Sequence, residues 1–340
     1  MNPLLSIIIP CYNNGKYLVD MIECFRHQTS PCWEMIIVDD GSTDDTPKRV
    51  IEHTTDLHNV TFMQRNRLPK GSVVCRNIGF QHSTGKYVCH LDADDLVSQT
   101  FVEHRIAFME AHPDVDYASF PAKTFTDSND LPTFSTEAET WGVNDESGDL
   151  LGRFLKADYP FSVWNNIYRK EAIVGLPWDE NVLIYTDFSF IVPGILIGLK
   201  HSFSGLEEID YYYRVEQTNK VAMTSNFVSQ AKCDSTLYLF EKTIKTLIDQ
   251  GKFDAYKQHF ANGLIFVHFK RLLLGTDQKN VNAYIGMCSK YFSSFRFRLM
   301  SPISRIKSGH RRVHALSVAL LLLYGDTRRI KASIERRLKK

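Results

Sequence analysis

The sequence predicts an α/β fold, in which a mostly parallel central sheet is flanked by helices, with a mainly helical C-terminal extension. Apolar runs alternate with amphipathic segments through the first hundred residues, as strands and helices do in open α/β sheets. Polar residues gather where these apolar runs end. From about residue 226 the segments have helical spacing. We therefore expect two domains, residues 1–222 and 223–340.

The composition is that of a globular protein. The chain has 340 residues, of which 44% are hydrophobic and 23% charged, with a formal net charge of +1. Its seven cysteines are scattered without a CxxC pair, which indicates reduced thiols. The first residues lack the basic and apolar regions of a secretory signal. These features predict a cytoplasmic protein.

The first strand is predicted at Leu4–Pro10, because a continuous apolar run is typical of a strand buried on both faces of a parallel sheet. An amphipathic helix follows at about Tyr17–Gln28. The same reasoning gives the next elements in order: a strand at Trp33–Val38, a helix with Pro47 in its first turn, a strand at Val60–Gln64, a helix at Val73–His82 and a strand at Tyr87–Leu91.

Three carboxylates crowd behind this fourth strand, at Asp92, Asp94 and Asp95. Residues two apart on extended backbone point the same way, so Asp92 and Asp94 could face one site. Carboxylates this close repel one another, and a hard cation such as Mg²⁺ or Mn²⁺ would relieve that cost better than zinc. The alternative is a solvated acidic loop that caps the following helix.

Polar residues also follow the first two strands, at Tyr12-Asn13 and Asp39-Asp40. The carboxyl ends of parallel strands meet at one edge of a sheet, where such folds bind ligands. This convergence favours a binding site over an isolated acidic loop. The chain lacks GxGxxG after its first strand and lacks GxxxxGK[ST], which argues against dehydrogenases and P-loop proteins.

The middle of the chain is less regular. The pattern predicts a helix at Phe101–Ala111, a strand at Asp116–Phe125, a polar stretch at Thr126–Gly148 that could be an insertion or a loop at the site, a helix at Leu150–Leu155 and a strand or loop at Phe161–Tyr168.

Asp187 interrupts the strongly apolar segment Val182–Gly198. A carboxylate there is costly unless it is paired or employed, and apolar surroundings would raise its pKa. It could instead cap a helix at Phe188–Ile197. A late strand, Ile209–Arg214, ends in an arginine that could hold a phosphate or form a surface ion pair.

Three segments of helical period make up the extension, at Phe227–Gln250, Phe253–Leu274 and Val281–Phe295. Basic residues dominate after Arg296 and flank the apolar run Ala315–Tyr324, which is shorter than the about 20 residues that span a bilayer. This pattern fits peripheral contact with an anionic membrane, at the inner face of the cell membrane, or a core helix with a solvated tail. Nucleic acid is not expected as a partner, because no recognised motif accompanies the charge.

Six segments taken together resemble the inverting glycosyltransferases with a GT-A fold, a family 2-like group that includes many bacterial surface-polysaccharide enzymes: SIIIPCYNNGKYL, IIVDDGSTDDT, RNIGF, GKYVCHLDADD, DENVLIYTDFSF and YYYR. The resemblance covers about Leu4–Val215. It implies metal-assisted transfer of a sugar from a nucleoside diphosphate sugar, in particular a UDP-sugar, to a hydroxyl of a glycan or a lipid-linked acceptor, with inversion.

The resemblance also implies roles for single residues. In the nucleotide pocket, Pro10 and Tyr12 would line the base, Asp40 would receive the base edge, Asp92 would lie beside the ribose, and Arg76 would support the pocket. Arg214 is added to this nucleotide-sugar group because of its position at the end of the tyrosine strand.

For the reaction itself, Asp94 would hold Mg²⁺ or Mn²⁺ against the diphosphate, and Asp187 would be the catalytic base. Trp164 and Asn165 are candidates for contact with the acceptor. The chain departs from the family in having Thr186 where a Glu is usual and Asn166 where many relatives have Lys.

A third departure lies after the tyrosine strand, where Glu216, Gln217 and Asn219 stand in place of a histidine. Two other functions therefore stay open at this point. A nucleotidyltransferase would release pyrophosphate, and an inactive sugar-nucleotide-binding protein would bind the donor without consuming it.

Overall fold

The computed structural model describes residues 2–128, 131–134, 140–141, 148–205, 208–215, 229–273 and 278–292. The chain divides into two compact units, Met1–Leu151 with Tyr159–Ala222, and Gly152–Asp158 with Met223–Lys340. Sequence analysis did not assign residues 152–158 to the C-terminal unit. The basic tail after Arg296, its apolar run, and Glu216, Gln217 and Asn219 lie outside the described residues.

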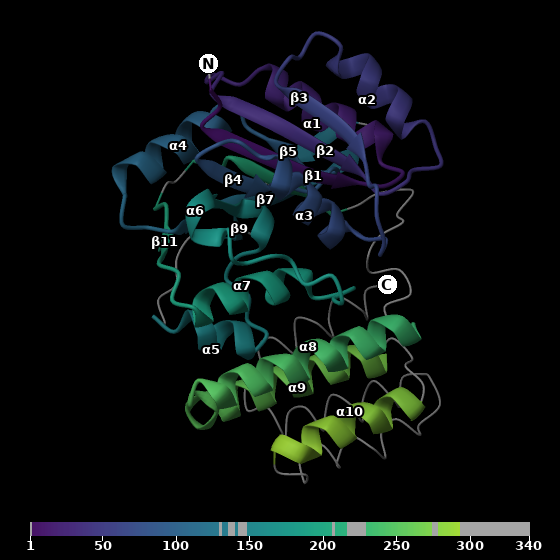
Figure 1. Cartoon of the computed structure of the whole chain (residues 1–340), viewed down its shortest axis with the longest axis vertical. Coiled ribbons are helices and arrows are strands. Elements are labelled where there is room, and N and C mark those ends of the chain that lie inside the picture. The colour runs from purple at the N-terminus through teal and green to yellow at the C-terminus, as the bar shows by residue number, and fades with distance from the viewer. Residues whose placement is uncertain are drawn as a thin grey trace. The chain divides into compact units, whose positions relative to one another are not determined.

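The main sheet of the first unit has, among the described residues, seven strands in the order β11-β6-β10-β4-β1-β2-β3 (Figure 1). They are β1 (Leu5–Cys11), β2 (Trp33–Asp39), β3 (Val60–Gln64), β4 (Tyr87–His90), β6 (Tyr117–Ser119), β10 (Asn166–Arg169) and β11 (His201–Phe203). The first four run parallel, whereas β10 runs antiparallel to β4 and β6. This mostly parallel arrangement confirms the predicted α/β class with a mostly parallel central sheet.

Helices flank this sheet (Figure 1). They are α1 (Gly15–Arg26), α2 (Thr46–Thr54), α3 (Ser72–His82), α4 (Phe101–Ala111), α6 (Lys170–Ile173) and α7 (Thr186–Leu196), with a short 3₁₀ turn, η1, at Val163–Asn165. Every residue of β1 is buried, as expected for a central strand covered on both faces.

Helix α3 packs against β1 and β2. A Cβ atom on Gly79 would lie 2.5 Å from Cγ2 of Ile8, so a larger residue at this position would push the helix away from the sheet. The glycine therefore fixes how closely α3, and with it Arg76, approaches the strands.

A second, smaller sheet has the order β5-β12-β7-β8, with β9 paired to β7. Its strands are β5 (Leu96–Val97), β7 (Ala122–Ser128), β8 (Leu131–Phe134), β9 (Thr140–Trp141) and β12 (Tyr211–Arg214). The prediction of one strand at Asp116–Phe125 was wrong, because β6 and β7 belong to different sheets. Pro121, which has no N–H for a ladder, lies at the break between them.

The second unit contains the helices α8 (Gln230–Asp249), α9 (Phe253–Leu273) and α10 (Gln278–Tyr291), which contact one another. The short helix α5 (Leu150–Leu155) leads into this unit, and a Cβ on Gly263 of α9 would lie 2.0 Å from the Leu155 carbonyl oxygen. The predicted helical character of the C-terminal region is confirmed. In the described part of the chain, none of the helices combines the length and apolarity that a bilayer-spanning segment needs.

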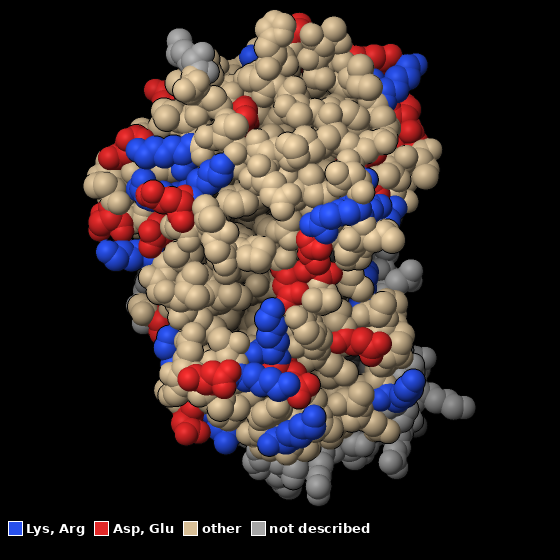
Figure 2. All heavy atoms as spheres, viewed as in Figure 1, with Lys and Arg blue, Asp and Glu red and all other residues tan. Residues whose placement is uncertain are grey.

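Acidic and basic side chains are intermixed on the face of the molecule that Figure 2 draws. The described residues of that face form no continuous surface of one sign.

Candidate functional site

The polar strand ends lie at one edge of the main sheet, because β1, β2 and β4 are parallel and adjacent. The loops after β1 and β2 are joined directly. The backbone N–H of Asn13 donates to Oγ of Ser42 at 2.9 Å, and the Ser42 hydroxyl donates to Oδ1 of Asp39 at 2.5 Å. Asp39 is thus a structural residue that holds the two loops together.

Asp40 points in a different direction from its neighbour. Its Oδ1 accepts a hydrogen bond from Nε of Arg65 at 2.5 Å, another from the Gly71 N–H at 3.1 Å, and a weaker contact from Sγ of Cys75 at 3.8 Å. These donors come from the segment that follows β3 and from the start of α3. They hold the Asp40 carboxylate in one orientation.

The first strand ends in the two residues expected at a base pocket. Pro10 is buried within β1, and Tyr12 lies directly after the strand and is partly exposed. The ammonium of Lys70 lies 3.5 Å from the centroid of the Tyr12 ring, a cation–π contact that orients the ring.

Arg76 and Asp92 form an ion pair, with Nη2 2.5 Å from Oδ1. The Arg76 guanidinium also lies 4.9 Å from the centroid of the Trp178 ring. Its Nη1 atom is buried and has no hydrogen-bond partner among the described residues. A buried unsatisfied guanidinium nitrogen is costly, so a bound group that accepts a hydrogen bond from it would be stabilised.

Asp94 and Asp95 have different surroundings although they are adjacent. The Asp95 side chain is fully buried and accepts hydrogen bonds from the Tyr211 hydroxyl at 2.6 Å and the Arg214 N–H at 2.8 Å. Asp94 is partly exposed, and its carbonyl oxygen accepts from Nε of Arg214 at 2.6 Å. The turn is thus fixed by Asp95 and by the Asp94 backbone.

Arg214 supports this turn from within the protein. Its guanidinium is buried, with Nη1 paired to Asp127 and Nη2 3.2 Å from Oδ2 of Asp20. The alternative prediction, in which Arg214 forms an ion pair on the surface, is wrong, because Arg214 is only 2% exposed. Since each of its side-chain nitrogens has a protein partner, the geometry favours a positioning role for Arg214 over direct contact with a phosphate.

Asp187 lies in the first turn of α7, whose N-cap is Tyr185 in the left-handed region with φ of 61°. The alternative in which Asp187 caps the helix is therefore wrong. The Ser162 side chain and the Val163 backbone both hydrogen-bond to the Asp187 carboxyl.

The pKa of Asp187 is raised to about 6, mainly by burial and also by the nearby charge of Asp92. Arg76 and the two hydrogen bonds act in the opposite direction. A carboxyl group with this pKa is ionised at neutral pH and can still accept a proton, which suits a general base.

Trp164 and Asn165 lie in η1, next to these partners of Asp187. The Trp164 ring stacks on Tyr211 at 4.8 Å and on Tyr213 at 5.3 Å between centroids. Asn165 is fully buried, and its amide binds the Phe120 carbonyl at 2.9 Å and the Ser162 N–H at 3.0 Å. This placement favours a structural role for Asn165 over contact with an acceptor.

Sequence reasoning missed Ser162 and Tyr213. Burial raises the pKa of Tyr213, and the charges of four carboxylates raise it further, in decreasing order Asp95, Asp92, Asp94 and Asp187. Its phenol therefore lies among the acidic groups of the site. The sequence predicts that the tyrosines of this strand alternate between its two faces, so Tyr211 and Tyr213 share one face, but it assigns Tyr213 no role at the site. Nothing in the local sequence singles out Ser162.

The described residues contain no group of three or more side chains that could hold a metal ion alone. Asp94 offers a partly exposed carboxylate, and Asp92 is occupied by Arg76. Mg²⁺ commonly takes one or two protein carboxylates and completes its shell with substrate phosphates and water. The donor set fits a cation shared with a phosphorylated ligand.

The family model "Glycosyl transferase family 2" matches residues 6–173. The minor teichoic acid biosynthesis protein GgaB of Bacillus subtilis is 25% identical over 250 residues, which are 72% of this chain and 26% of GgaB. The putative teichuronic acid biosynthesis glycosyltransferase TuaG of the same organism is 37% identical over 109 residues, 32% of this chain and 42% of TuaG. The chain therefore spans less than half the length of either relative.

Among solved structures, S. aureus TarS 1-349 in complex with UDP-GlcNAc has a TM-score of 0.63 at 18% identity, covering 99% of this chain and 92% of that one. The mannosyltransferase PcManGT from Pyrobaculum calidifontis, in complex with GDP-Man and Mn²⁺, has a TM-score of 0.52 at 15% identity, covering 94% and 88%. At these identities the similarity shows the fold.

Proposed function

The chain belongs to glycosyl transferase family 2 through its residues 6–173, and on that premise we propose that it transfers a sugar from a nucleoside diphosphate sugar to a hydroxyl group. The proposed donor is a UDP-sugar, and the proposed acceptor is a glycan or a lipid-linked saccharide of a bacterial surface polysaccharide. The relatives named for teichoic and teichuronic acid biosynthesis, and the UDP-GlcNAc complex of TarS, support this choice.

One observation carries the proposal. A carboxyl group whose pKa is raised to about 6, Asp187, lies close enough to the Arg76–Asp92 pair for both charges to affect its ionisation. A titratable group perturbed in this way beside a cation with a spare buried nitrogen is typical of a reaction site.

Asp187 would act as the general base. Its carboxylate takes the proton of the acceptor hydroxyl, and the acceptor oxygen forms a bond to the anomeric carbon from the face opposite the leaving group. The bond from that carbon to the diphosphate oxygen breaks, and the diphosphate leaves with the electron pair. A single displacement of this kind inverts the anomeric centre. A positioned base contributes about 10²–10⁴-fold to such a rate.

The nucleotide would lie along the ends of β1, β2 and β4. In this proposal Tyr12 contacts the base beside Pro10, Asp40 accepts from the base edge, and the Arg76–Asp92 pair binds the ribose and sugar side of the donor. The hydrogen bonds that fix Asp40 support a role in recognition, because a preorganised acceptor loses little entropy on binding.

Asp94 would hold Mg²⁺ or Mn²⁺ against the two phosphates. When bound there, the cation would offset the negative charge that develops on the leaving diphosphate. Asp95, Tyr211 and Arg214 hold the turn that presents the Asp94 carboxylate. Trp164 and Tyr213 line the same region, and we assign them to the acceptor side of the site.

Release of nucleoside diphosphate from a panel of UDP- and GDP-sugars tests the proposal directly. Each sugar is incubated with the protein in Mn²⁺ or in chelator, using the wild type and Asp187→Asn. We expect metal-dependent release from one donor, because water can replace an unknown acceptor slowly, and we expect the variant to lose it. A parallel incubation with a nucleoside triphosphate and a sugar 1-phosphate tests the alternative, because release of pyrophosphate from the triphosphate would indicate a nucleotidyltransferase.

Calorimetric titration of UDP with Mn²⁺ complements this assay. Asp187→Asn should bind UDP as the wild type does, since the base is not a donor ligand, whereas Asp94→Ala should weaken metal-dependent binding. If Asp187→Asn turned over donor at the wild-type rate, Asp187 would not be the general base. Tight donor binding without release, even when acceptor fragments are supplied, would favour an inactive binding protein.

A further inference from the structure

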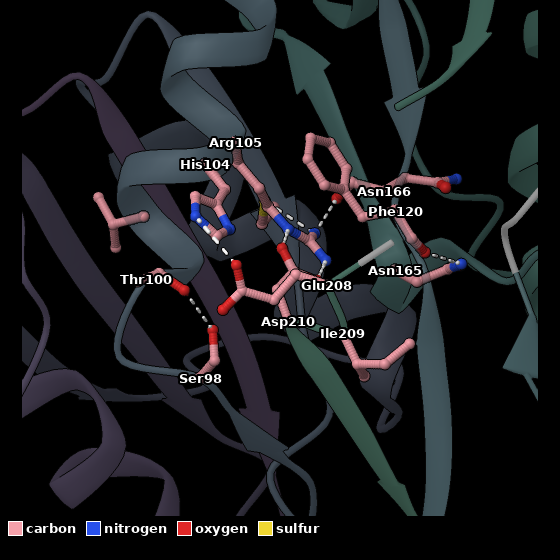
Figure 3. Close-up of polar contacts among 12 residues, drawn as sticks. Ser98, Thr100, His104, Arg105, Phe120, Asn165, Asn166, Glu208, Ile209 and Asp210 are labelled. Atoms are coloured by element: carbon pink, nitrogen blue, oxygen red, sulfur yellow. Dashed lines mark hydrogen bonds and ion pairs between the residues drawn. The ribbon is translucent and has the colours of Figure 1, made fainter. Parts of the chain in front are cut away.

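A buried ion pair joins α4 to the residue that precedes β12 (Figure 3). Arg105 donates from Nε to Oδ2 of Asp210 at 2.9 Å and from Nη2 to Oδ1 at 3.0 Å. Both side chains are buried to 1% exposure or less. Neither residue belongs to the site described above.

The third nitrogen of Arg105 ties the pair to the main sheet. Nη1 donates to the Asn166 carbonyl of β10 at 3.1 Å and lies 3.7 Å from Sγ of Cys89 in β4. The guanidinium also lies 3.9 Å from the centroid of the Phe101 ring. Arg105 therefore fixes the Asp210 carboxylate relative to the strand that carries the acidic turn.

The chain from Asp210 onward makes most of the contacts that hold this turn. The Asp210 carbonyl accepts from the Ser98 N–H at 3.0 Å, and β12 pairs with β5, immediately after the acidic residues. Tyr211 and Arg214 of β12 then bind Asp95 and the Asp94 carbonyl. A path of direct contacts runs from Arg105 to the backbone carbonyl of Asp94, next to the side chain proposed to hold the cation.

The pair is poorly suited to a purely stabilising role. Burying two charges costs several kcal/mol of solvation, so a buried pair is often no more stabilising than apolar residues of the same volume. A bidentate arginine, by contrast, fixes its partner in both distance and angle. Such precision is useful where a carboxylate must meet a cation and two phosphates.

We propose that the Arg105–Asp210 pair is a positioning device that holds β12 in register against the acidic turn and so sets the affinity of the Asp94 site for a divalent cation with a nucleoside diphosphate. This inference rests on the proposed function for its ligand. It adds two positioning residues that do not touch donor or acceptor.

The test uses three variants of the full chain. Asp210→Asn and Arg105→Lys each disturb the bidentate pair, and the double variant Arg105→Gln with Asp210→Asn leaves no buried charge without a partner. Arg169→Lys is the matched control, because Arg169 is also buried but donates to the carbonyls of Val115, Met109 and His112.

Two readouts are measured on each variant. In hydrogen exchange without ligand, the amides of residues 94–98 should exchange faster in the Arg105 and Asp210 variants than in wild type or Arg169→Lys. In UDP titrations, the Mn²⁺ concentration for half-maximal binding should rise, by up to about 10–100-fold, the range typical of altering outer residues that orient a metal ligand. Binding at saturating Mn²⁺ should recover.

The two readouts separate this inference from the function on which it rests. Unchanged exchange at residues 94–98 in the double variant would overturn the positioning role, whatever the protein binds. A wild type that binds UDP without any need for Mn²⁺ would overturn the metal assignment, while faster exchange in the variants would still support the positioning of the turn. If Arg169→Lys changed hydrogen exchange and Mn²⁺ dependence as much as the Arg105 and Asp210 variants do, the pair would only stabilise the fold in general, and the positioning role would be overturned.

Discussion

Arg76 holds Asp92 with Nη2 2.5 Å from Oδ1 while its guanidinium lies over the ring of Trp178. The ion pair and the ring contact together leave the arginine side chain little freedom to move. The remaining nitrogen, Nη1, is buried and without a partner among the described residues. A fixed cation with one spare donor is an arrangement that binds an oxygen-rich ligand at little cost in entropy.

The first prediction concerns this arginine. Arg76→Lys should weaken UDP binding about 10–100-fold, because a lysine cannot keep the Asp92 pair and also donate to a ligand from a planar fork. Isothermal titration calorimetry with Mn²⁺ measures the affinity. Arg49→Lys, which changes an exposed pair with Asp45, is the control. Equal affinities for Arg76→Lys and wild type would show that Nη1 does not contact the nucleotide.

The second prediction follows from the pKa of Asp187, raised to about 6 by burial and by Asp92. The base must be ionised to accept a proton, so the rate of diphosphate release should be level above pH 7 and fall about tenfold per pH unit well below pH 6. A pH–rate profile at saturating donor and Mn²⁺ checks this. A profile that stays flat down to pH 5 would mean that another group accepts the proton.

The third prediction concerns stability. Because the folded-state pKa of Asp187 lies above the value of about 3.9 in an unfolded chain, ionisation of this group opposes folding as the pH rises toward and past 6. Asp187→Asn should therefore unfold at higher temperature than wild type at pH 8. The difference should shrink as the pH falls and vanish near pH 4, where both side chains are neutral.

Differential scanning calorimetry at the two pH values measures this effect. Combined with lost turnover, a gain in stability at pH 8 would be the expected signature of a residue kept for function at the expense of folding. A variant that is less stable than wild type at pH 8 would contradict the raised pKa.

The fourth prediction concerns the contact between α3 and the sheet. Gly79→Ala should lower the free energy of unfolding by about 1–3 kcal/mol, because its new methyl group would lie 2.5 Å from Ile8. Gly175→Ala is the matched control, since a Cβ there meets nothing within 4 Å. Urea denaturation gives both values. Donor binding by Gly79→Ala should also weaken, as α3 carries Arg76; equal stability of the two variants would contradict this packing.

Much of the fold was predictable from apolar periodicity. The strand at Val60–Gln64 and the helices at Phe101–Ala111 and Leu150–Leu155 have the predicted bounds. The two-residue strand β5 and the three-residue strand β11 were not predicted, because segments so short have no periodicity to detect.

The contacts within the site were harder to predict, because the spacing of residues along the chain does not show which distant segments meet in the folded protein. The acidic turn and Asp187 stand out in the sequence as charges beside apolar runs. The partners that hold them, such as Tyr211 for Asp95 and Ser162 for Asp187, come from distant segments. The surface ion pair considered for Arg214 was wrong for the same reason, since the buried position of this arginine depends on Asp20 and Asp127 in other elements.

The contact between Arg214 and Asp20 spans 194 positions in the chain. During synthesis, β1 to β4 and their helices emerge from the ribosome long before β12 does. The apolar core around these strands can form early, but the acidic turn has no partner for Asp95 until Tyr211 and Arg214 have been made. The last described strand of the first unit therefore completes the site, and a nascent chain that stops short of β12 would carry the sheet without a fixed Asp94 turn.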